Sequence, residues 1–278
     1  MKNSKKKGGK LMTAGLVLLF AAGLLVMLYP MISDLWNRLV WESVVSEYAD
    51  DTDSMSEDEL REEWEAARRY NTEHKGNVLL DPFEEDSREN RQYKSLLNPS
   101  GNGVMGYIEI PEIDQRLVIY HGTSEAVLEK GCGHIAGTSL PVGGKGTHAV
   151  IAAHRGLPTA KLFTDLDQLK KGDRFYLFIL DKTLAYEVDQ IKVVKPDCLD
   201  ELQIQEDRDL VTLFTCTPYS VNTHRLLVRG HRVKYEPDEA GQVVSPYLWL
   251  AMIIAAVITL VLIILLAKKV RASHSIKS

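Results

Sequence analysis

The chain has 278 residues, of which 45% are hydrophobic and 26% charged, so it contains enough apolar material for a folded core. Its formal net charge of −5 gives no reason to expect nucleic-acid binding. Clustered cysteine and histidine ligands and glycine-punctuated calcium loops are both missing from the sequence. We therefore expect neither a metal site nor a cofactor.

Two long apolar segments lie near the ends of the chain. Residues 11–32 and residues 248–267 contain no charged side chain. Since a helix rises about 1.5 Å per residue, each segment can cross the roughly 30 Å hydrocarbon layer of a bilayer. The first segment also fits a secretory signal, but no clear cleavage site follows Met31, which favours an uncleaved signal anchor. The sequence therefore predicts two transmembrane helices in contact with a lipid bilayer.

The charges that flank these segments predict their orientation. Five lysines precede residue 11, and four Lys or Arg residues follow residue 267. Acidic residues prevail on the two inner flanks, for example Asp34 and Glu236. By the positive-inside rule, the basic tails 1–10 and 268–278 are cytoplasmic and residues 33–247 lie outside the cell. We expect a two-pass protein of the cell membrane whose working part is extracellular.

The first half of the external region is expected to be helix followed by loop. Residues 33–76 are interpreted as an acidic helical linker, because the acid-rich run from Glu42 to Glu65 is typical of a solvated helix face or a mobile arm. Ser56-Glu57-Asp58-Glu59 has the form of a capping box and predicts a helix that continues to about Tyr70. Residues 77–103 are polar and are expected to form a long loop of the kind that serves as a lid or binding segment.

Residues 104–236 consist of short β-rich runs separated by turns. Eight strands are expected, at Val104–Ile110, Leu117–His121, Gly133–Gly137, Thr147–His154, Arg174–Leu180, Leu184–Val194, Leu210–Cys216 and Arg225–Tyr235. Helix is expected only at Ser124–Glu129 and Leu162–Leu169. This pattern predicts an all-β domain, a closed or nearly closed eight-stranded β-barrel without exposed sheet edges. Residues 237–247 would link the barrel to the second apolar segment.

Cys216 and Arg225 are the first residues that could carry chemistry together. Three cysteines, Cys132, Cys198 and Cys216, lie in the external region, and an odd number leaves at least one thiol unpaired. If the strands that end at Cys216 and begin at Arg225 form an antiparallel hairpin, the two residues face each other with Cβ atoms about 5 Å apart. A neighbouring cation favours the nucleophilic thiolate. Alternatively, Cys216 is a small buried residue and Arg225 pairs with an acid such as Asp209.

His154 is the favoured partner for such a nucleophile. A cysteine nucleophile needs a group that shares its proton, normally histidine, and the chain has eight histidines. His154 ends the apolar run Val150–Ala153 and precedes a turn, and functional groups concentrate where a rigid strand gives way to a loop. The other histidines lie in tails, in the linker, beside Arg225, or in strands where a hydrogen-bonded structural role is the default.

The segments around these residues resemble the sortase family. Thr212-Leu213-Phe214-Thr215-Cys216 is similar to the sortase signature Thr-Leu-x-Thr-Cys, and Arg225 follows at a spacing that the family uses. Ala153-His154-Arg155-Gly156 resembles the histidine segment of the family. The sequences from Thr215 to Gly230 and from His154 to Phe163 resemble those of class C, the pilin-polymerising sortases of Gram-positive bacteria. The resemblance covers roughly residues 77–233, and it departs from the expected pattern at Ser220, where we would expect glycine.

This resemblance implies a lid over the active site. Class C enzymes close their cleft with an Asp-Pro-aromatic motif, and Asp81-Pro82-Phe83 matches it inside the expected long loop. Asp81 would pair with Arg225, Phe83 would cover the sulfur of Cys216, and Pro82 would stiffen the step between them. From the residues alone, Asp-Pro is also a common turn dipeptide.

The resemblance also implies the reaction and the partners. It implies a cysteine transpeptidase whose Cys216 cleaves LPxTG-like sorting motifs after threonine and holds the acyl group as a thioester. His154 would carry the proton, and Arg225 would stabilise the oxyanion or orient the substrate. The acyl group would pass to the lysine of a pilin subunit, which builds a covalent pilus. The implied partners are LPxTG-type pilins with their acceptor lysine.

Three other functions remain as alternatives. The first is a housekeeping-type sortase that anchors surface proteins to peptidoglycan, against which the Asp81 motif and the second apolar segment argue. The second is a non-catalytic β-barrel surface receptor in which Cys216 and His154 are core residues. The third, a papain-like protease, is disfavoured because that fold needs a substantial helical half around its cysteine.

Overall fold

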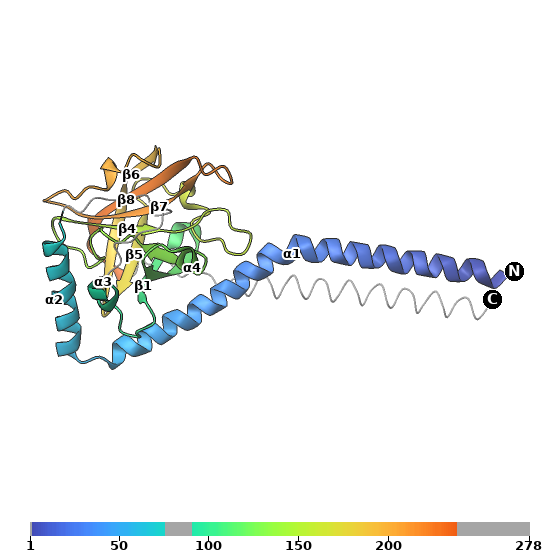
Figure 1. Cartoon of the computed structure of the whole chain (residues 1–278), viewed down its shortest axis with the longest axis horizontal. Coiled ribbons are helices and arrows are strands. Elements are labelled where there is room, and N and C mark those ends of the chain that lie inside the picture. The colour runs from blue at the N-terminus through green and yellow to red at the C-terminus, as the bar shows by residue number, and fades with distance from the viewer. Residues whose placement is uncertain (1, 76–90, 238–278) are drawn as a thin grey trace. The chain divides into compact units, whose positions relative to one another are not determined.

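The computed structural model describes residues 2–75 and 91–237, and eight β-strands dominate this part of the chain (Figure 1). The strands are β1 (Val104–Ile110), β2 (Gln115–His121), β3 (Cys132–His134), β4 (Thr147–Ala152), β5 (Arg174–Ile179), β6 (Lys182–Val194), β7 (Asp209–Thr217) and β8 (His224–Val233). They close into a barrel in the order β1-β2-β3-β4-β7-β8-β6-β5. The predicted eight-stranded barrel is therefore confirmed.

Two of the strand pairs in the barrel are parallel, and one of them positions the candidate site. β4 pairs with β7 in parallel, from Thr147 opposite Asp209 to Ala152 opposite Phe214. Because the two strands run in the same direction, their C-terminal ends lie side by side at one edge of the barrel. β8 runs antiparallel to β7 and begins at this same edge.

The strands β4 and β7 are buried on both faces. Alternate residues of β4 belong to different apolar clusters, with Ala149 and Ile151 in the main core and Val150 and Ala152 in a second cluster. Side chains of a strand alternate between its two faces, so both faces of β4 are covered. This explains the unbroken apolar run that precedes His154, since a strand buried on both sides has no polar face.

Within the described residues, four α-helices and three short 3-10 helices accompany the barrel. The α-helices are α1 (Lys2–Ser54), α2 (Glu57–Glu73), α3 (Arg91–Ser95) and α4 (Glu125–Leu128), and the 3-10 helices are η1 (Pro111–Ile113), η2 (Leu166–Gln168) and η3 (Asp200–Leu202). The predicted capping box at the start of α2 is present. The Glu59 backbone N–H donates to the Ser56 hydroxyl at 3.3 Å, and the Ser56 backbone N–H donates to the Glu59 carboxylate at 2.8 Å.

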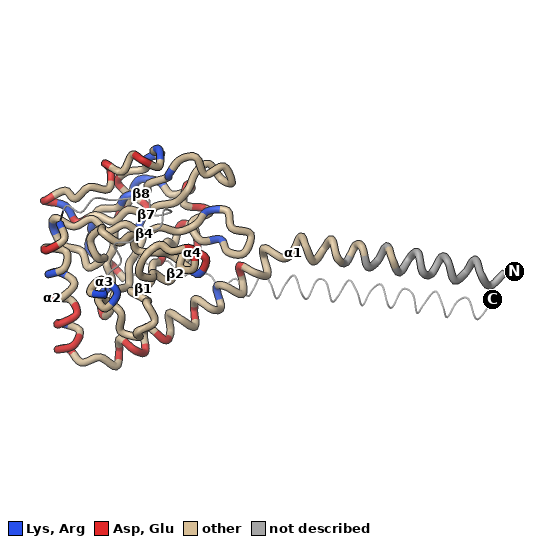
Figure 2. The backbone as a smooth tube through the Cα atoms, in the orientation of Figure 1, with Lys and Arg blue, Asp and Glu red and all other residues tan. Residues whose placement is uncertain are grey.

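The acidic helices pack one face on the barrel. Figure 2 shows acidic residues along α2 and the second half of α1. The opposite faces carry buried aromatic residues, among them Trp41, Tyr48 and Trp64. The Tyr48 hydroxyl donates to the Met105 carbonyl at 2.9 Å and accepts from the Leu180 N–H at 2.8 Å. The interpretation of this region as a solvated helix face therefore holds for one side only, because the other side is docked.

Two local predictions were wrong in extent. The strand expected at Gly133–Gly137 ends at His134, because the following residues turn so that the Ser139 carbonyl lies 2.8 Å from His134 Nε2. The helix expected at Leu162–Leu169 is reduced to η2. Leu162 has a φ of 41°, in the left-handed region, and this conformation prevents a right-handed helix from starting there.

The structure does not support the membrane span expected at residues 11–32. This segment lies within α1, which continues beyond it through polar residues to Ser54. Across the described residues, no helix is long and apolar enough to cross a membrane. The second expected span, residues 248–267, lies outside the described residues.

Candidate active site

The structure pairs Cys216 with Arg225, as the hairpin interpretation predicts. Cys216 of β7 and Arg225 of β8 are direct partners in the antiparallel register, next to the pair Thr217 and His224. Both side chains are largely buried, with 8% of Cys216 and 9% of Arg225 exposed. A buried cation directly across from a thiol favours the charged, nucleophilic form of the sulfur.

Arg225 also holds the loop that joins the two strands. Its guanidinium Nη1 donates to the Asn222 carbonyl at 3.0 Å and to the His224 carbonyl at 3.3 Å. The backbone N–H groups of Val221 and Asn222 both donate to the Pro218 carbonyl. The loop is thus folded tightly beside the thiol, and the arginine contacts both the loop and the strand end.

His154 lies one strand away from Cys216 at the same edge of the barrel. The Ala153 N–H donates to the Phe214 carbonyl at 3.1 Å, which continues the parallel β4–β7 register past the end of β4. His154 follows Ala153, so it stands level with Thr215 and Cys216. The neighbouring ends of β4, β7 and β8 therefore bring His154, Cys216 and Arg225 to one edge of the barrel (Figure 1).

The two threonines of the Thr-Leu-x-Thr-Cys segment connect β7 to β4. The Thr215 hydroxyl donates to the Ala153 carbonyl at 2.7 Å, directly beside His154. The Thr212 hydroxyl lies 2.8 Å from Nε2 of His148. Both threonines are buried, with at most 1% of either exposed. Their role in the described structure is to hold the nucleophile strand against the histidine strand.

Arg155 secures the loop that follows His154. Its guanidinium donates to the Thr217 hydroxyl at 3.0 Å, to the Thr164 carbonyl at 3.1 Å and to the Asp167 carboxylate at 2.5 Å. Thr217 directly follows Cys216, so this one side chain ties the histidine loop to the end of the nucleophile strand. In the sequence, only the position of Arg155 immediately after His154 indicated that it belongs to the site.

Gly156 and Tyr219 bring the two loops of this edge into contact. Gly156 has a φ of 80°, and a Cβ added there would lie 3.0 Å from the Tyr219 ring. A larger residue would therefore be strained in its backbone and would push against the ring. Tyr219 is 55% exposed, so its ring forms part of the surface beside Cys216.

Glu125 is a neighbour of His154 that sequence reasoning missed. Its carboxylate lies 3.5 Å from Nε2 of the imidazole and is itself 73% exposed. It comes from α4, between β2 and β3, and no local pattern links it to the histidine. The pair is an ion pair whenever the imidazole is protonated.

The remaining buried histidines have structural contacts. His134 Nδ1 lies 2.9 Å from the Tyr93 hydroxyl, and His148 Nδ1 lies 3.0 Å from the Gln203 carbonyl. Burial lowers the pKa of both His134 and His148 to about 4, so both are neutral at neutral pH. Their predicted structural role is therefore consistent with their surroundings.

The other two cysteines differ from Cys216. Cys132 is fully buried, and burial raises the pKa of its thiol well above the ordinary value. Cys198 is exposed, and its sulfur lies 3.8 Å from the Asp197 carboxylate. No disulfide joins any of the three. In the register of the described strands, Cys132 lies opposite Ile119 and Cys198 belongs to no strand, whereas Cys216 lies opposite Arg225.

Two further expectations concern metals and the lid. Within residues 2–75 and 91–237, no group of three or more Cys, His, Asp or Glu side chains could hold a metal ion. The lid motif Asp81-Pro82-Phe83 lies outside the described residues. Its closure over Cys216 and Arg225 stays a prediction.

Known proteins share this fold and these segments. A family model for the sortase domain matches residues 108–233. The structure of sortase C from Streptococcus pneumoniae is 47% identical, with a TM-score of 0.63 over 69% of this chain and 97% of that chain. Sortase C1 from Streptococcus agalactiae is 46% identical, with a TM-score of 0.65 over 70% of this chain and 100% of that chain. Sortase D from Bacillus subtilis is 28% identical over 53% of this chain and 73% of that protein.

The fold and these relatives define a β-barrel cysteine transpeptidase. The chain belongs to the sortase family, and the solved structures that it matches include class C sortases.

Proposed function

We propose that this sortase polymerises pilins, by cleaving LPxTG-like sorting motifs after threonine and joining the acyl group to a pilin lysine. The observation that carries the proposal is the direct pairing of Cys216 with Arg225, one strand away from His154. The likeness to sortase C structures supports the pilin substrate, since the Streptococcus pneumoniae enzyme is described by its pilin substrate specificity.

In the first half of the proposed reaction, Cys216 forms a thioester. A free thiol with a pKa near ~8.5 is only a few per cent thiolate at neutral pH, so the neighbouring cation matters. The thiolate attacks the threonine carbonyl carbon, and Arg225 stabilises the negative charge that develops on the oxygen. The carbon–nitrogen bond then breaks, and protonated His154 supplies the proton of the departing amine. Loss of one such oxyanion donor typically removes about 3 kcal/mol of transition-state stabilisation.

In the second half, the pilin lysine resolves the thioester. Its amine attacks the thioester carbonyl carbon, and neutral His154 accepts the proton that the amine loses. The carbon–sulfur bond breaks, Cys216 leaves as the thiolate, and a Thr–Lys isopeptide bond remains. The same histidine therefore acts first as acid and then as base.

Anchoring at the cell membrane is part of the same proposal. It is supported by the uncharged segments 11–32 and 248–267 and by the basic residues on their outer flanks. A membrane-anchored enzyme would meet a membrane-anchored pilin by diffusion in two dimensions.

The proposal is tested by incubating the protein with a candidate pilin and searching for the Thr–Lys isopeptide bond by mass spectrometry. We expect the bond with the wild-type protein and with Cys198→Ala, which removes an exposed thiol outside the site. We expect no bond with Cys216→Ala, in a protein that unfolds at the normal temperature. An isopeptide bond made by Cys216→Ala would exclude this nucleophile. Products in which a peptidoglycan amine replaces the lysine would instead identify the housekeeping function.

A further inference from the structure

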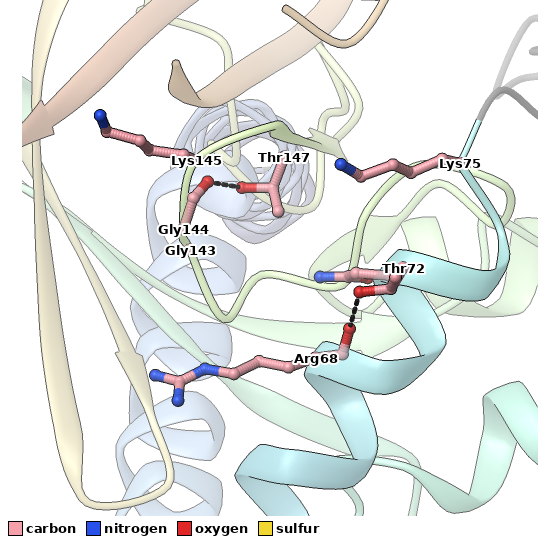
Figure 3. A pocket seen from close by; sticks show the side chains of 8 residues that line it. Arg68, Thr72, Lys75, Gly143, Gly144, Lys145 and Thr147 are labelled. Carbon is pink, nitrogen blue, oxygen red and sulfur yellow. Dashed lines mark hydrogen bonds between the residues drawn. The ribbon is translucent and has the colours of Figure 1, made fainter. Parts of the chain in front are cut away.

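A cavity of about 190 Å³ lies between the end of α2 and the loop before β4 (Figure 3). Its lining includes the cations Arg68, Lys75 and Lys145 and the hydroxyls of Thr72 and Thr147. In the described part of the chain, no carboxylate belongs to this lining.

The three cations have no acidic partner among the described residues. Arg61, Arg116 and Lys192 show the contrast, since each of them forms an ion pair with an acid. In Figure 3 the Lys75 side chain extends from the end of α2 toward the loop that carries Thr147, whereas the Arg68 side chain runs to the lower left and that of Lys145 to the upper left. The three residues therefore come from two separate segments and line one cavity.

The dipole of α2 explains only part of this arrangement. The C-terminal end of a helix attracts cations, which accounts for Lys75 just beyond the last turn of α2, but Arg68 precedes that turn. It does not account for Lys145, which belongs to the loop between β3 and β4. The carbonyls of the last turn also have donors, since the Thr72 hydroxyl donates to the Arg68 carbonyl at 3.0 Å and the His74 N–H donates to the Tyr70 carbonyl at 3.0 Å.

The loop is shaped to admit the Lys75 ammonium group. Gly146 has a φ of 72°, and a Cβ added there would lie 2.9 Å from Nζ of Lys75 and 3.1 Å from the Glu206 carbonyl oxygen. Glycine at this position therefore lets the ammonium reach the loop. The Asp209 carboxylate lies beside Gly143, and it already accepts from the Gly144 N–H at 2.7 Å and the Tyr186 hydroxyl at 3.0 Å.

We propose that this cavity binds an anion of the phosphate type, a phosphomonoester or phosphodiester. A phosphate group has several acceptor oxygens that point in different directions, so cations from two segments can contact it at once. The volume is below the range of pockets that enclose drug-sized ligands, which fits a small charged group.

The proposed site is separate from the active site. Thr147 is the first residue of β4 and lines the cavity, whereas His154 lies two residues beyond Ala152, the last residue of the same strand. At about 3.3 Å per residue, the two sites lie roughly 20 Å apart along β4. Binding at the cavity is therefore measurable without reference to transpeptidation.

The test is calorimetric titration of the full-length protein in detergent with inorganic phosphate, with chloride used to keep the ionic strength constant. A second titration uses glycerophosphoglycerol, a phosphodiester, and a third uses a polyglutamate peptide. The variants are Lys75→Gln and Lys145→Gln, with Lys171→Gln as the control. Lys171 is exposed in the turn before β5, away from the cavity.

We expect saturable binding of at least one phosphate compound to the wild-type protein and to Lys171→Gln. Each cavity variant should bind about fivefold more weakly, the loss expected for one exposed ion pair. Tighter binding of inorganic phosphate would indicate a free anion, and tighter binding of the diester a phosphate polymer or lipid headgroup. Equal affinity in all variants, or saturable binding of neither compound, would overturn the proposal. Lysine-dependent binding of polyglutamate alone would replace the phosphate ligand with an acidic protein.

Discussion

The backbone at Ser220, in the loop between β7 and β8, has a φ of 63°, in the left-handed region that glycine favours. Resemblance to the sortase pattern already leads one to expect glycine here, and the geometry supplies the reason. A side chain in this region costs about 1 kcal/mol relative to glycine. A serine tolerates many turn conformations, but this one is among the less favourable.

Ser220→Gly is expected to raise the free energy of unfolding by up to about 1 kcal/mol, because it removes the strain of the left-handed conformation. Urea unfolding of the two proteins measures the change. Asn222→Gly is the matched control, since Asn222 also has a positive φ of 59° but asparagine tolerates it better. We expect Asn222→Gly to raise the free energy of unfolding by less than Ser220→Gly does. A lower free energy of unfolding in Ser220→Gly would contradict the explanation by backbone strain.

Glu125 is expected to support His154 through the ion pair at 3.5 Å. Because the carboxylate is largely exposed, Glu125→Gln should lower the transpeptidation rate by no more than about fivefold. The rates of the variant and of the wild-type protein in a peptide transpeptidation assay measure the loss.

The control for Glu125 is Glu129→Gln, which removes a carboxylate at the C-terminal end of the same short helix. Its transpeptidation rate should match that of the wild-type protein. If both variants lose rate equally, the effect belongs to the helix or to the overall charge and not to the contact with His154.

At the scale of elements, the parallel pairing of β4 with β7 is the contact that assembles the candidate active site. Cys216 and Arg225 are close because they belong to one hairpin, which depends on residues near each other in the sequence. His154 joins them only because β4 lies beside β7, and these strands are separated by β5 and β6 in the chain. The site therefore depends on the side-chain contacts that hold this pair.

Thr215→Val is expected to lower the free energy of unfolding by about 1–3 kcal/mol, because the buried Ala153 carbonyl loses the hydroxyl that donates to it. The transpeptidation rate should also fall, since Ala153 directly precedes His154. Urea unfolding and a peptide transpeptidation assay measure the two effects. Thr215→Ser keeps the hydroxyl and should recover most of the rate, and failure to do so would argue against the hydrogen bond as the cause.

At the scale of the whole molecule, two buried histidines connect folding to pH. Burial lowers the pKa of His134 and His148 to about 4, compared with about 6.5 in an unfolded chain. Between these values the unfolded state binds more protons than the folded state, so stability falls as the pH falls. Above pH 6.5 the contribution is complete, and it is lost progressively toward pH 4.

The free energy of unfolding is therefore expected to decrease as the pH falls from 6.5 to 5. The slope should correspond to the uptake of up to two protons on unfolding. Urea unfolding at several pH values measures the slope. Removing one of the two groups by His148→Gln should reduce it by about one proton, whereas His224→Gln, at the start of β8, should leave it unchanged. An equal slope in His148→Gln and in the wild-type protein would show that other groups cause the dependence.

Local patterns in the sequence were enough to predict the strands, the capping box of α2 and the hairpin that pairs Cys216 with Arg225. Strand alternation, capping and hairpin register depend on residues a few positions apart, so they can be seen in one segment at a time. The errors at Gly133–Gly137 and Leu162–Leu169 arise where a turn contact or an unusual φ interrupts such a pattern.

Contacts between distant segments were decided by the folded barrel. Three such contacts join residues that no local pattern relates. They are the pairing of β4 with β7, the approach of Glu125 to His154, and the docking of Trp41 and Tyr48. The cation-lined cavity between α2 and the loop before β4 is of the same kind. Such contacts follow from the order in which the strands close the barrel, and that order is set by the packing of the whole core.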